Sequence, residues 1–153
     1  MTRNIILAAA QMGPVSRTET RTAVVRRMIE LMRQAAAMGA QVVAFPEAAL
    51  TAFFPHWWIE DEDEINSWFE TEMPGPETLP LFDEARRLRI GFHLGYCELD
   101  RSGGRARRFN SAILVDRDGA LIGKYRKIHL PGHADHRPDT PFQNLEKRCF
   151  EVG

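Results

Sequence analysis

The segment Gln41-Val42-Val43-Ala44-Phe45-Pro46-Glu47 determines how this 153-residue chain folds. Its short apolar run is bounded by a proline, which predicts a buried strand over residues 41–45. The carboxylate of Glu47 then follows directly after the carboxyl end of that strand. Because α/β proteins bind ligands at this edge of the sheet, Glu47 is the first candidate for a functional residue.

The residues before this segment predict a parallel βαβ unit. Residues 5–11 form a short apolar run before Gly13-Pro14, which predicts another buried strand. Ser16 and Glu19 fit a capping box, so a helix is expected to begin at Ser16 and to end at Gly39, which suits a left-handed C-cap. Apolar residues recur at three- and four-residue steps between them: Val24, Met28, Leu31, Met32 and Ala35.

The later part of the chain predicts a second helix and an antiparallel meander. The apolar positions of that helix are Leu81, Phe82, Ala85 and Leu88. Three strands are then expected, at residues 90–99, 109–115 and 121–128. Turn-forming residues at 101–104 and 116–119 separate them. A parallel beginning and an antiparallel end predict an α/β (α+β) fold with a mixed sheet.

Residues 50–75 break this periodicity. The aromatic segment 53–58 favours either the mouth of a pocket near the candidate carboxylate or a packed loop or subunit contact. Asp61 and Glu64 fit an N-cap and its capping-box partner for a short helix through Phe69. The acidic residues here are therefore expected to begin a helix that has a solvated face.

A second segment, residues 123–131, reads GKYRKIHLP and supplies a cation. Lys127 ends a strand-like stretch, and strand alternation places it on the face of Tyr125, opposite to Arg126. A carboxylate base beside a fixed ammonium suits acyl transfer through a thiolate, because the base moves protons while the cation stabilises the oxyanion. The competing interpretations are a surface lysine and, for Glu47, a helix-capping or salt-bridging carboxylate.

These segments resemble the nitrilase (carbon-nitrogen hydrolase) superfamily, and the similarity is closest to its N-carbamoyl-D-amino-acid hydrolases. The sequence similarity extends along nearly the whole chain and includes residues 71–76, 107–110, 123–133 and 145–148. The resemblance implies part of a nitrilase-type α-β-β-α sandwich, of which this chain would supply the larger share of one sheet. It also implies cleavage of non-peptide carbon-nitrogen bonds without a metal or an organic cofactor.

The resemblance further implies roles for four residues. Glu47 matches the general base, and Lys127 matches the cation that stabilises the oxyanion. Glu146 matches a second glutamate that orients the lysine and the substrate, and His129 matches a histidine in the pocket region. Asn144 stands where the closest branch tends to carry a pocket histidine, and this departure leaves the substrate preference open.

The family's nucleophile is a cysteine, and neither cysteine of this chain matches its position. Cys97 lies in a strand pattern, where a lone thiol is usually a buried apolar group. Cys149 follows Lys147 and Arg148, whose charges lower a thiol pKa, but its place in the chain differs from that of the family's nucleophile. We therefore interpret residues 1–153 as a single incomplete domain, the amino-terminal half of an enzyme, which is inactive alone.

The function implied for the complete enzyme is hydrolysis of N-carbamoyl-D-amino acids to D-amino acids, carbon dioxide and ammonia. Its partners would be small-molecule N-carbamoyl or amide substrates, and the family implies a homo-oligomer. Two alternatives stay open. One is another superfamily enzyme, such as an aliphatic amidase or a β-ureidopropionase, and the other is a non-catalytic binding or assembly subunit.

Composition argues against several other classes of function. The chain has 44% hydrophobic and 27% charged residues, as ordinary globular domains do, and its net charge of -1 creates no field that attracts nucleic acid or anionic lipid. No apolar run approaches the roughly 18 residues of a membrane span, and the first residues do not resemble a signal peptide. Two free thiols then suggest a reducing compartment, so we expect a cytoplasmic protein.

Two charged clusters have simpler interpretations than a binding site. His129, His133 and His136 superficially resemble a metal site, but Pro131-Gly132 interrupts the helix that would align them. A solvated loop is the better interpretation for the second and third histidines. The arginines within residues 101–108 surround a Gly-rich turn and predict a charged hairpin tip rather than a nucleic-acid surface.

Overall fold

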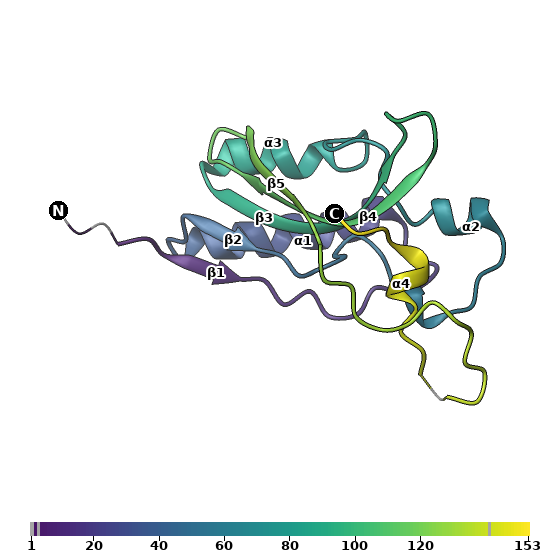
Figure 1. Cartoon of the computed structure of the whole chain (residues 1–153). Helices are drawn as coiled ribbons and strands as arrows, with labels where there is room; N and C mark the ends of the chain where they lie inside the picture. The colour runs from purple at the N-terminus through teal and green to yellow at the C-terminus, as the bar shows by residue number, and fades with distance from the viewer. Residues whose placement is uncertain (1, 3, 141) are drawn as a thin grey trace.

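The computed structural model describes residue 2, residues 4–140 and residues 142–153, which form a five-stranded sheet with packed helices (Figure 1). The strands lie in sequence order: β1 (Leu7–Ala9), β2 (Val42–Ala44), β3 (Gly91–Asp100), β4 (Arg107–Val115) and β5 (Leu121–Arg126). β1, β2 and β3 pair in parallel, whereas β3, β4 and β5 pair antiparallel. The mixed sheet predicted from the sequence is therefore confirmed.

Two helices cover one face of the sheet and bury the larger core. They are α1 (Arg21–Ala37) and α3 (Leu79–Leu88), and they contact each other. The buried helix residues include Val24, Met28, Met32, Leu81 and Phe82, and the sheet residues that they meet include Val43, Phe92, Leu94 and Ile113. The helix periodicity in the sequence predicted this face because side chains three and four residues apart lie on one side of a helix.

The predicted start of α1 was wrong, whereas its end is confirmed. The Ser16 N–H does donate to the Glu19 carboxylate at 3.3 Å, but these residues form a separate turn before the helix. The N-cap is Thr20, whose hydroxyl accepts from the N–H of Ala23 at 3.2 Å. This second capping hydroxyl lies closer to the apolar stripe, so the helix begins after it. Gly39 follows the helix with a φ of 81°.

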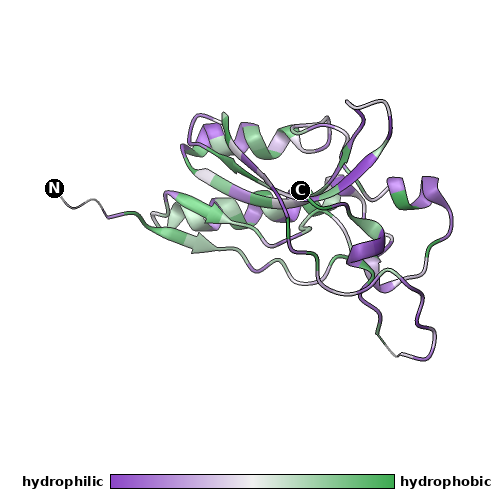
Figure 2. Cartoon of the chain, in the orientation of Figure 1, coloured by the Kyte–Doolittle hydropathy of each residue, from purple (hydrophilic) through white to green (hydrophobic). Residues whose placement is uncertain are grey.

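The prediction that the first strand is buried was also wrong. Leu7 is 69% exposed, and only Ala8 of this strand packs against the core. β1 is an edge strand, and its register with Val42 places Leu7 on the sheet face opposite to α1 and α3. Within the described residues no helix lies over this part of the face. In Figure 2 the ribbon of β1, at this edge of the sheet, has the green colour of hydrophobic residues.

Short helices cover the other end of the same face. They are η1 (Phe54–His56), α2 (Glu62–Asn66) and α4 (Glu146–Cys149). They surround a second core that includes Phe54, Ile59, Ile65, Phe69, Cys97, Leu99, Leu145 and Phe150. Phe54 and Pro55 are buried here, so the centre of the aromatic segment is a packed loop.

α2 is capped as predicted but is shorter than predicted. The Asp61 carboxylate accepts from the N–H groups of Asp63 and Glu64. The helix ends at Asn66 rather than continuing through Phe69, because Phe69 turns into the second core. No helix in the described ranges combines the length and the apolar character that crossing a membrane requires.

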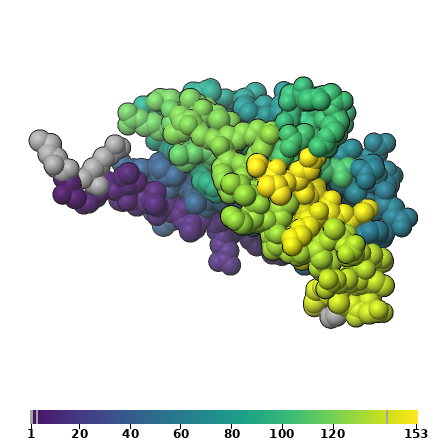
Figure 3. Space-filling model, viewed as in Figure 1, coloured from purple at the N-terminus to yellow at the C-terminus, as the bar shows by residue number. Residues whose placement is uncertain are grey.

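The last residues of the chain lie beside β4 and β5. The N–H of Glu151 donates to the carbonyl of Arg108 at 2.7 Å, and the N–H of Gly153 donates to the carbonyl of Lys127 at 3.1 Å. In Figure 3 this segment, in yellow, lies against the green segment that contains β5. Gly153 is therefore a neighbour of the candidate cation.

Candidate active site

Glu47 lies in the loop that follows β2, at the carboxyl edge of the parallel strands, as the sequence predicted. The loop is tied to β3, because the N–H of Ala49 donates to the carbonyl of Gly95 at 2.9 Å. A Cβ atom on Gly95 would lie only 2.7 Å from the Cα of Glu47, so this close approach requires glycine. Ala48 has a φ of 47°, a left-handed conformation that is uncommon for alanine. Tertiary packing therefore holds the loop in a strained shape.

Lys127 is the first residue after β5, and its side chain meets two carboxylates. Its Nζ lies 2.7 Å from Oε1 of Glu47 and 2.9 Å from Oε2 of Glu146. Its backbone N–H donates to the carbonyl of Asn110 at 2.8 Å and so extends the pairing of β4 with β5. The acid and the amine, 80 residues apart in the chain, thus converge at one place.

Glu146 is the first residue of α4 and is only 4% exposed. Asn144 holds it in place: the amide of Asn144 donates to Oε1 of Glu146 at 3.3 Å, and its Oδ1 accepts from the N–H of Glu146 at 3.1 Å. Asn144, the residue at which the sequence departs from the closest branch of the family, therefore contacts the second glutamate of this cluster. Oε2 of Glu146 remains directed at Lys127.

Asn110 belongs to the same cluster, and sequence reasoning gave it no role. Its Nδ2 donates to Oε1 of Glu47 at 2.6 Å, and the residue is only 5% exposed. A signal was present, because Asn110 is a polar residue between Phe109 and the apolar end of β4, where a buried amide needs a partner. Its partner could not be named without knowing that the loop after β2 lies beside β4.

A small cavity of about 310 Å³ lies beside this cluster. Its lining includes Glu47, His93, Asn110, Ala112, Tyr125 and Lys127. The strand residues among them lie on the sheet face opposite to α1 and α3, as expected from the alternation of side chains. The cavity volume is at the lower end of the range for small-ligand sites. The aromatic segment 53–58 does not contribute to this lining.

Hydrogen bonds keep the acid and the amine charged at neutral pH. Burial alone would raise the pKa of Glu47, but bonds from Lys127 and Asn110 outweigh it and hold the pKa of this carboxyl below its usual value. Burial alone would lower the pKa of Lys127, but the carboxylates of Glu47 and Glu146 outweigh it and raise the pKa of the ammonium. The cluster thus holds one cation between two carboxylates.

The remaining candidate, His129, does not meet this cluster. It is exposed, and the cavity lining does not include it. Farther along the same loop, His136 stacks on Trp58 with 4.6 Å between the ring centroids. Across the part of the chain that the structure describes, no three His, Cys, Asp or Glu side chains are grouped so that they could hold a metal ion.

The two cysteines are both buried in the second core. Burial raises the pKa of the Cys97 thiol to about 12 and that of the Cys149 thiol to about 11. Both thiols are therefore protonated at neutral pH, and neither residue lines the cavity beside Glu47.

The comparisons with known proteins agree with this fold. The sequence profile of the carbon-nitrogen hydrolase family matches residues 6–153. The chain is 28% identical over 141 residues to an aliphatic nitrilase of Rhodococcus rhodochrous, which covers 88% of this chain and 37% of the relative. It is 29% identical over 106 residues to omega-amidase NIT2 of Homo sapiens, which covers 69% of this chain and 34% of the relative.

A solved structure shows the same arrangement of strands and helices. A carbon-nitrogen hydrolase from Helicobacter pylori G27 superimposes with a TM-score of 0.71 at 20% identity, over 97% of this chain and 44% of that one. This likeness concerns the fold, whereas the profile match over residues 6–153 shows that the chain belongs to the carbon-nitrogen hydrolase family. It spans less than half the length of these three proteins.

Proposed function

We propose that this chain is the amino-terminal part of a hydrolase that cleaves carbon-nitrogen bonds other than peptide bonds, with an N-carbamoyl-D-amino acid as substrate. The observation that carries this proposal is the ammonium of Lys127, 2.7 Å from Glu47 and 2.9 Å from Glu146, beside a small cavity. Family membership supports the class of reaction. The sequence resemblance to N-carbamoyl-D-amino-acid hydrolases supports the choice of substrate.

In the proposed mechanism, a cysteine outside these 153 residues supplies the nucleophile. Glu47 takes the proton of this thiol, and the thiolate attacks the carbamoyl carbon while Lys127 stabilises the oxyanion. Glu47 returns the proton to the leaving nitrogen, which departs as ammonia. It then takes a proton from water, which attacks the same carbon and releases the sulfur. The resulting carbamate loses carbon dioxide and leaves the free amino acid.

The other cluster members support this mechanism in distinct ways. Glu146 contacts the same ammonium at 2.9 Å and would orient it. We assign His129 to the outer part of the substrate pocket, which the remainder of the enzyme would complete. The buried, protonated thiols of Cys97 and Cys149 are poor nucleophiles, so we propose that the isolated chain is an incomplete domain and inactive.

We also propose that the complete enzyme is a cytoplasmic homo-oligomer. Two free, buried cysteines are consistent with a reducing compartment. Apolar side chains on the uncovered end of the sheet face opposite to α1 and α3, such as Leu7 and Leu114, are consistent with further layers of protein there. No cofactor takes part in the proposed mechanism.

The decisive experiment combines the chain with a separately expressed carboxyl-terminal half that carries the family's cysteine. Ammonia release is then measured with N-carbamoyl-D-phenylalanine, its L-enantiomer, an aliphatic amide and N-carbamoyl-β-alanine. We expect turnover of the D-enantiomer above the others. Preference for the amide or for N-carbamoyl-β-alanine would identify a different hydrolase of the family. Absence of turnover with every substrate would favour a non-catalytic subunit.

The isolated chain provides the second half of the test. We expect it to release no ammonia from N-carbamoyl-D-phenylalanine, because it lacks an accessible thiolate. Release of ammonia that a thiol reagent abolishes would refute the proposal that the domain is incomplete.

A further inference from the structure

We propose that Asn110 is a positioning residue that holds Oε1 of Glu47, so that Oε2 is the oxygen that exchanges protons during the reaction. The assignment of proton exchange rests on the proposed function above. The contacts of Asn110 that support this role are made within the 153 residues, so they can be tested without measuring catalysis.

Asn110 touches both members of the acid–amine pair. Its side-chain amide donates to Oε1 of Glu47 at 2.6 Å, and its backbone carbonyl accepts from the N–H of Lys127 at 2.8 Å. It lies within β4, whose pairing with β3 and β5 fixes its backbone on both sides. One rigid strand residue therefore sets the distance between a loop carboxylate and the lysine that follows β5.

The two oxygens of Glu47 have different surroundings. Asn110 and Lys127 both donate to Oε1, and among the described residues no hydrogen bond reaches Oε2. An oxygen that already accepts two bonds, one of them from an ammonium, is a poor site for a proton. Protonation at Oε2 leaves both bonds intact, because the carbonyl oxygen of a neutral carboxyl still accepts. The proton is therefore directed to Oε2.

The chemistry of this contact requires an amide. An ionised carboxylate only accepts hydrogen bonds, so the NH₂ group of Asn110 must face Glu47. The side chain of Glu47 is 54% exposed, and Lys127 alone would leave it free to rotate about that one contact. Asn110 is almost completely buried and cannot turn away toward solvent. Asn110 thus supplies the second hydrogen bond that fixes the orientation of the Glu47 carboxylate.

The first test follows the titration of Glu47 by NMR in the 153-residue chain with ¹³C-labelled glutamate side chains. Asn110→Leu removes the donor, and Asn110→Asp keeps the shape but places a second carboxylate beside Glu47. We expect the midpoint of Glu47 to move to higher pH in both, by about one unit or more in the Asp variant, where a like charge is added.

Thr78→Val is the matched control for this titration. Thr78 is fully buried, and its hydroxyl accepts from the N–H of Gly75 at 2.8 Å, away from the cavity. This variant loses a buried hydrogen bond and should unfold at a lower temperature without moving the Glu47 midpoint. If the Asn110 variants likewise lose only thermal stability, Asn110 is a structural residue and the proposal fails. The near-isosteric Asp variant decides the question where the Leu variant does not fold.

The second test uses the chain combined with the carboxyl-terminal half. Asn110→Leu should lower kcat by about 10²-fold with little change in KM, because misplacement of a catalytic group by about 1 Å costs this much. The acid limb of the kcat–pH profile should move in the same direction as the NMR midpoint. An unchanged limb would overturn the positioning role. Inactivity of the unmodified pair would instead refute the proposed function, while the NMR titration still tests the hold of Asn110 on Glu47.

Discussion

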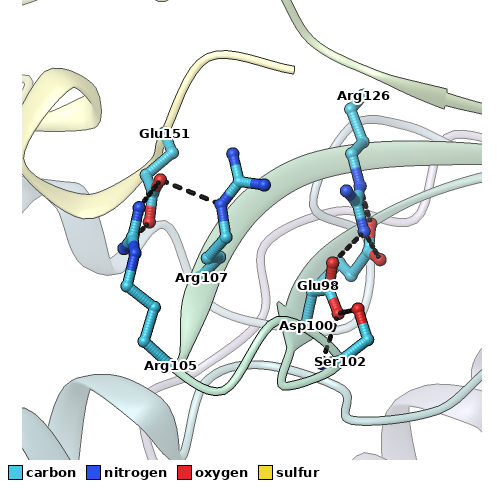
Figure 4. A network of polar contacts seen from close by, with 7 residues as sticks. All are labelled: Glu98, Asp100, Ser102, Arg105, Arg107, Arg126 and Glu151. Carbon is cyan, nitrogen blue, oxygen red and sulfur yellow. Dashed lines mark hydrogen bonds and ion pairs between the residues drawn. The ribbon is translucent and has the colours of Figure 1, made fainter.

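Glu98 and Glu47 are both paired with cations near the end of β5, yet their surroundings differ. Arg126 and Lys127 are consecutive, and strand alternation sends them to opposite faces of the sheet. Glu98 is 6% exposed, and both of its oxygens are occupied by Arg126, Ser111 and Lys124. Figure 4 shows how Arg126 joins Glu98 to Asp100. Glu47 is about half exposed, and the donors that reach it from the described residues all meet one of its oxygens.

The difference teaches that pKa alone does not mark a reactive carboxylate. Burial alone would raise the pKa of Glu98, but bonds from Arg126, Lys124 and Ser111 hold it below its usual value. The pKa of Glu47 is lowered in the same way by Lys127 and Asn110. What separates them is an accessible oxygen of Glu47 that receives no hydrogen bond from the part of the chain that the structure describes. We therefore interpret the Glu98 cluster as structural and the Glu47 cluster as the reactive one.

The largest expected effect is on stability, at the structural cluster. Arg126→Leu leaves the buried carboxylate of Glu98 without its bidentate partner, and breaking such a pair costs about 3–5 kcal/mol. Urea denaturation measures this free energy of unfolding. Arg101→Leu, at an exposed arginine of the adjacent turn, is the control and should change it by less than about 0.5 kcal/mol. Equal effects of the two variants would contradict the structural role of the Glu98 cluster.

The next effect is on activity, at the other cluster. Lys127→Ala should lower kcat by about 10²–10³-fold in the chain combined with a carboxyl-terminal half, because an oxyanion donor is lost. It also leaves the buried carboxylate of Glu146 without its cation, so the free energy of unfolding of this variant is measured beside its activity. Lys147→Ala, at an exposed lysine of α4, serves as control and should keep full activity. If the Lys127 variant were as active as this control, the interpretation of the Glu47 cluster as the reactive one would be wrong.

A smaller effect sharpens the contrast between the two faces. Ser111→Ala removes a 2.6 Å bond to the charged Glu98 and should cost about 1.5–3 kcal/mol, the range for hydrogen bonds to charged groups. Tyr125→Phe removes a 3.3 Å bond from the N–H of Ile128 at a half-exposed residue and should cost about 0.5 kcal/mol. Thermal unfolding of both variants provides the measurement. The reverse order would show that the open face is the more tightly held.

The smallest effect concerns the pH dependence of stability. Because the pKa of Glu98 is lower in the folded chain than in the unfolded one, its stabilisation is complete above the ordinary carboxyl pKa and is lost as the pH falls through the folded pKa. Between about pH 6 and pH 3, Glu98→Gln should therefore lose less stability than the unmodified chain does. Urea midpoints at several pH values measure the difference. Parallel declines would indicate that other carboxylates control acid unfolding.

Other carboxylates contribute equally to both proteins in that comparison. Bonds from Arg87 and Arg33 lower the pKa of Glu84 to about 2, and this group also loses stabilisation in acid. Subtracting the two pH profiles therefore isolates the contribution of Glu98.

Much of the fold could be predicted because it depends on neighbours in the chain. The period of the apolar residues identified α1 and α3, and the turn residues separated β3, β4 and β5. Alternation along β5 placed Lys127 and Tyr125 together on the cavity side, where the structure has them. The start of α1 was missed because Ser16 and Thr20 are both good caps, and capping preference alone does not choose between them.

The amino-acid sequence was sufficient to place an acid after one strand and an amine after another, because periodicity and strand ends are local properties. Only the packed chain decided which groups they meet. The contact of Asn110 with Glu47 exists because β4 lies beside the loop after β2, and the exposure of Leu7 exists because nothing in the described residues covers that end of the face. Such contacts depend on distances between segments far apart in the chain, and neither composition nor spacing encodes those distances directly.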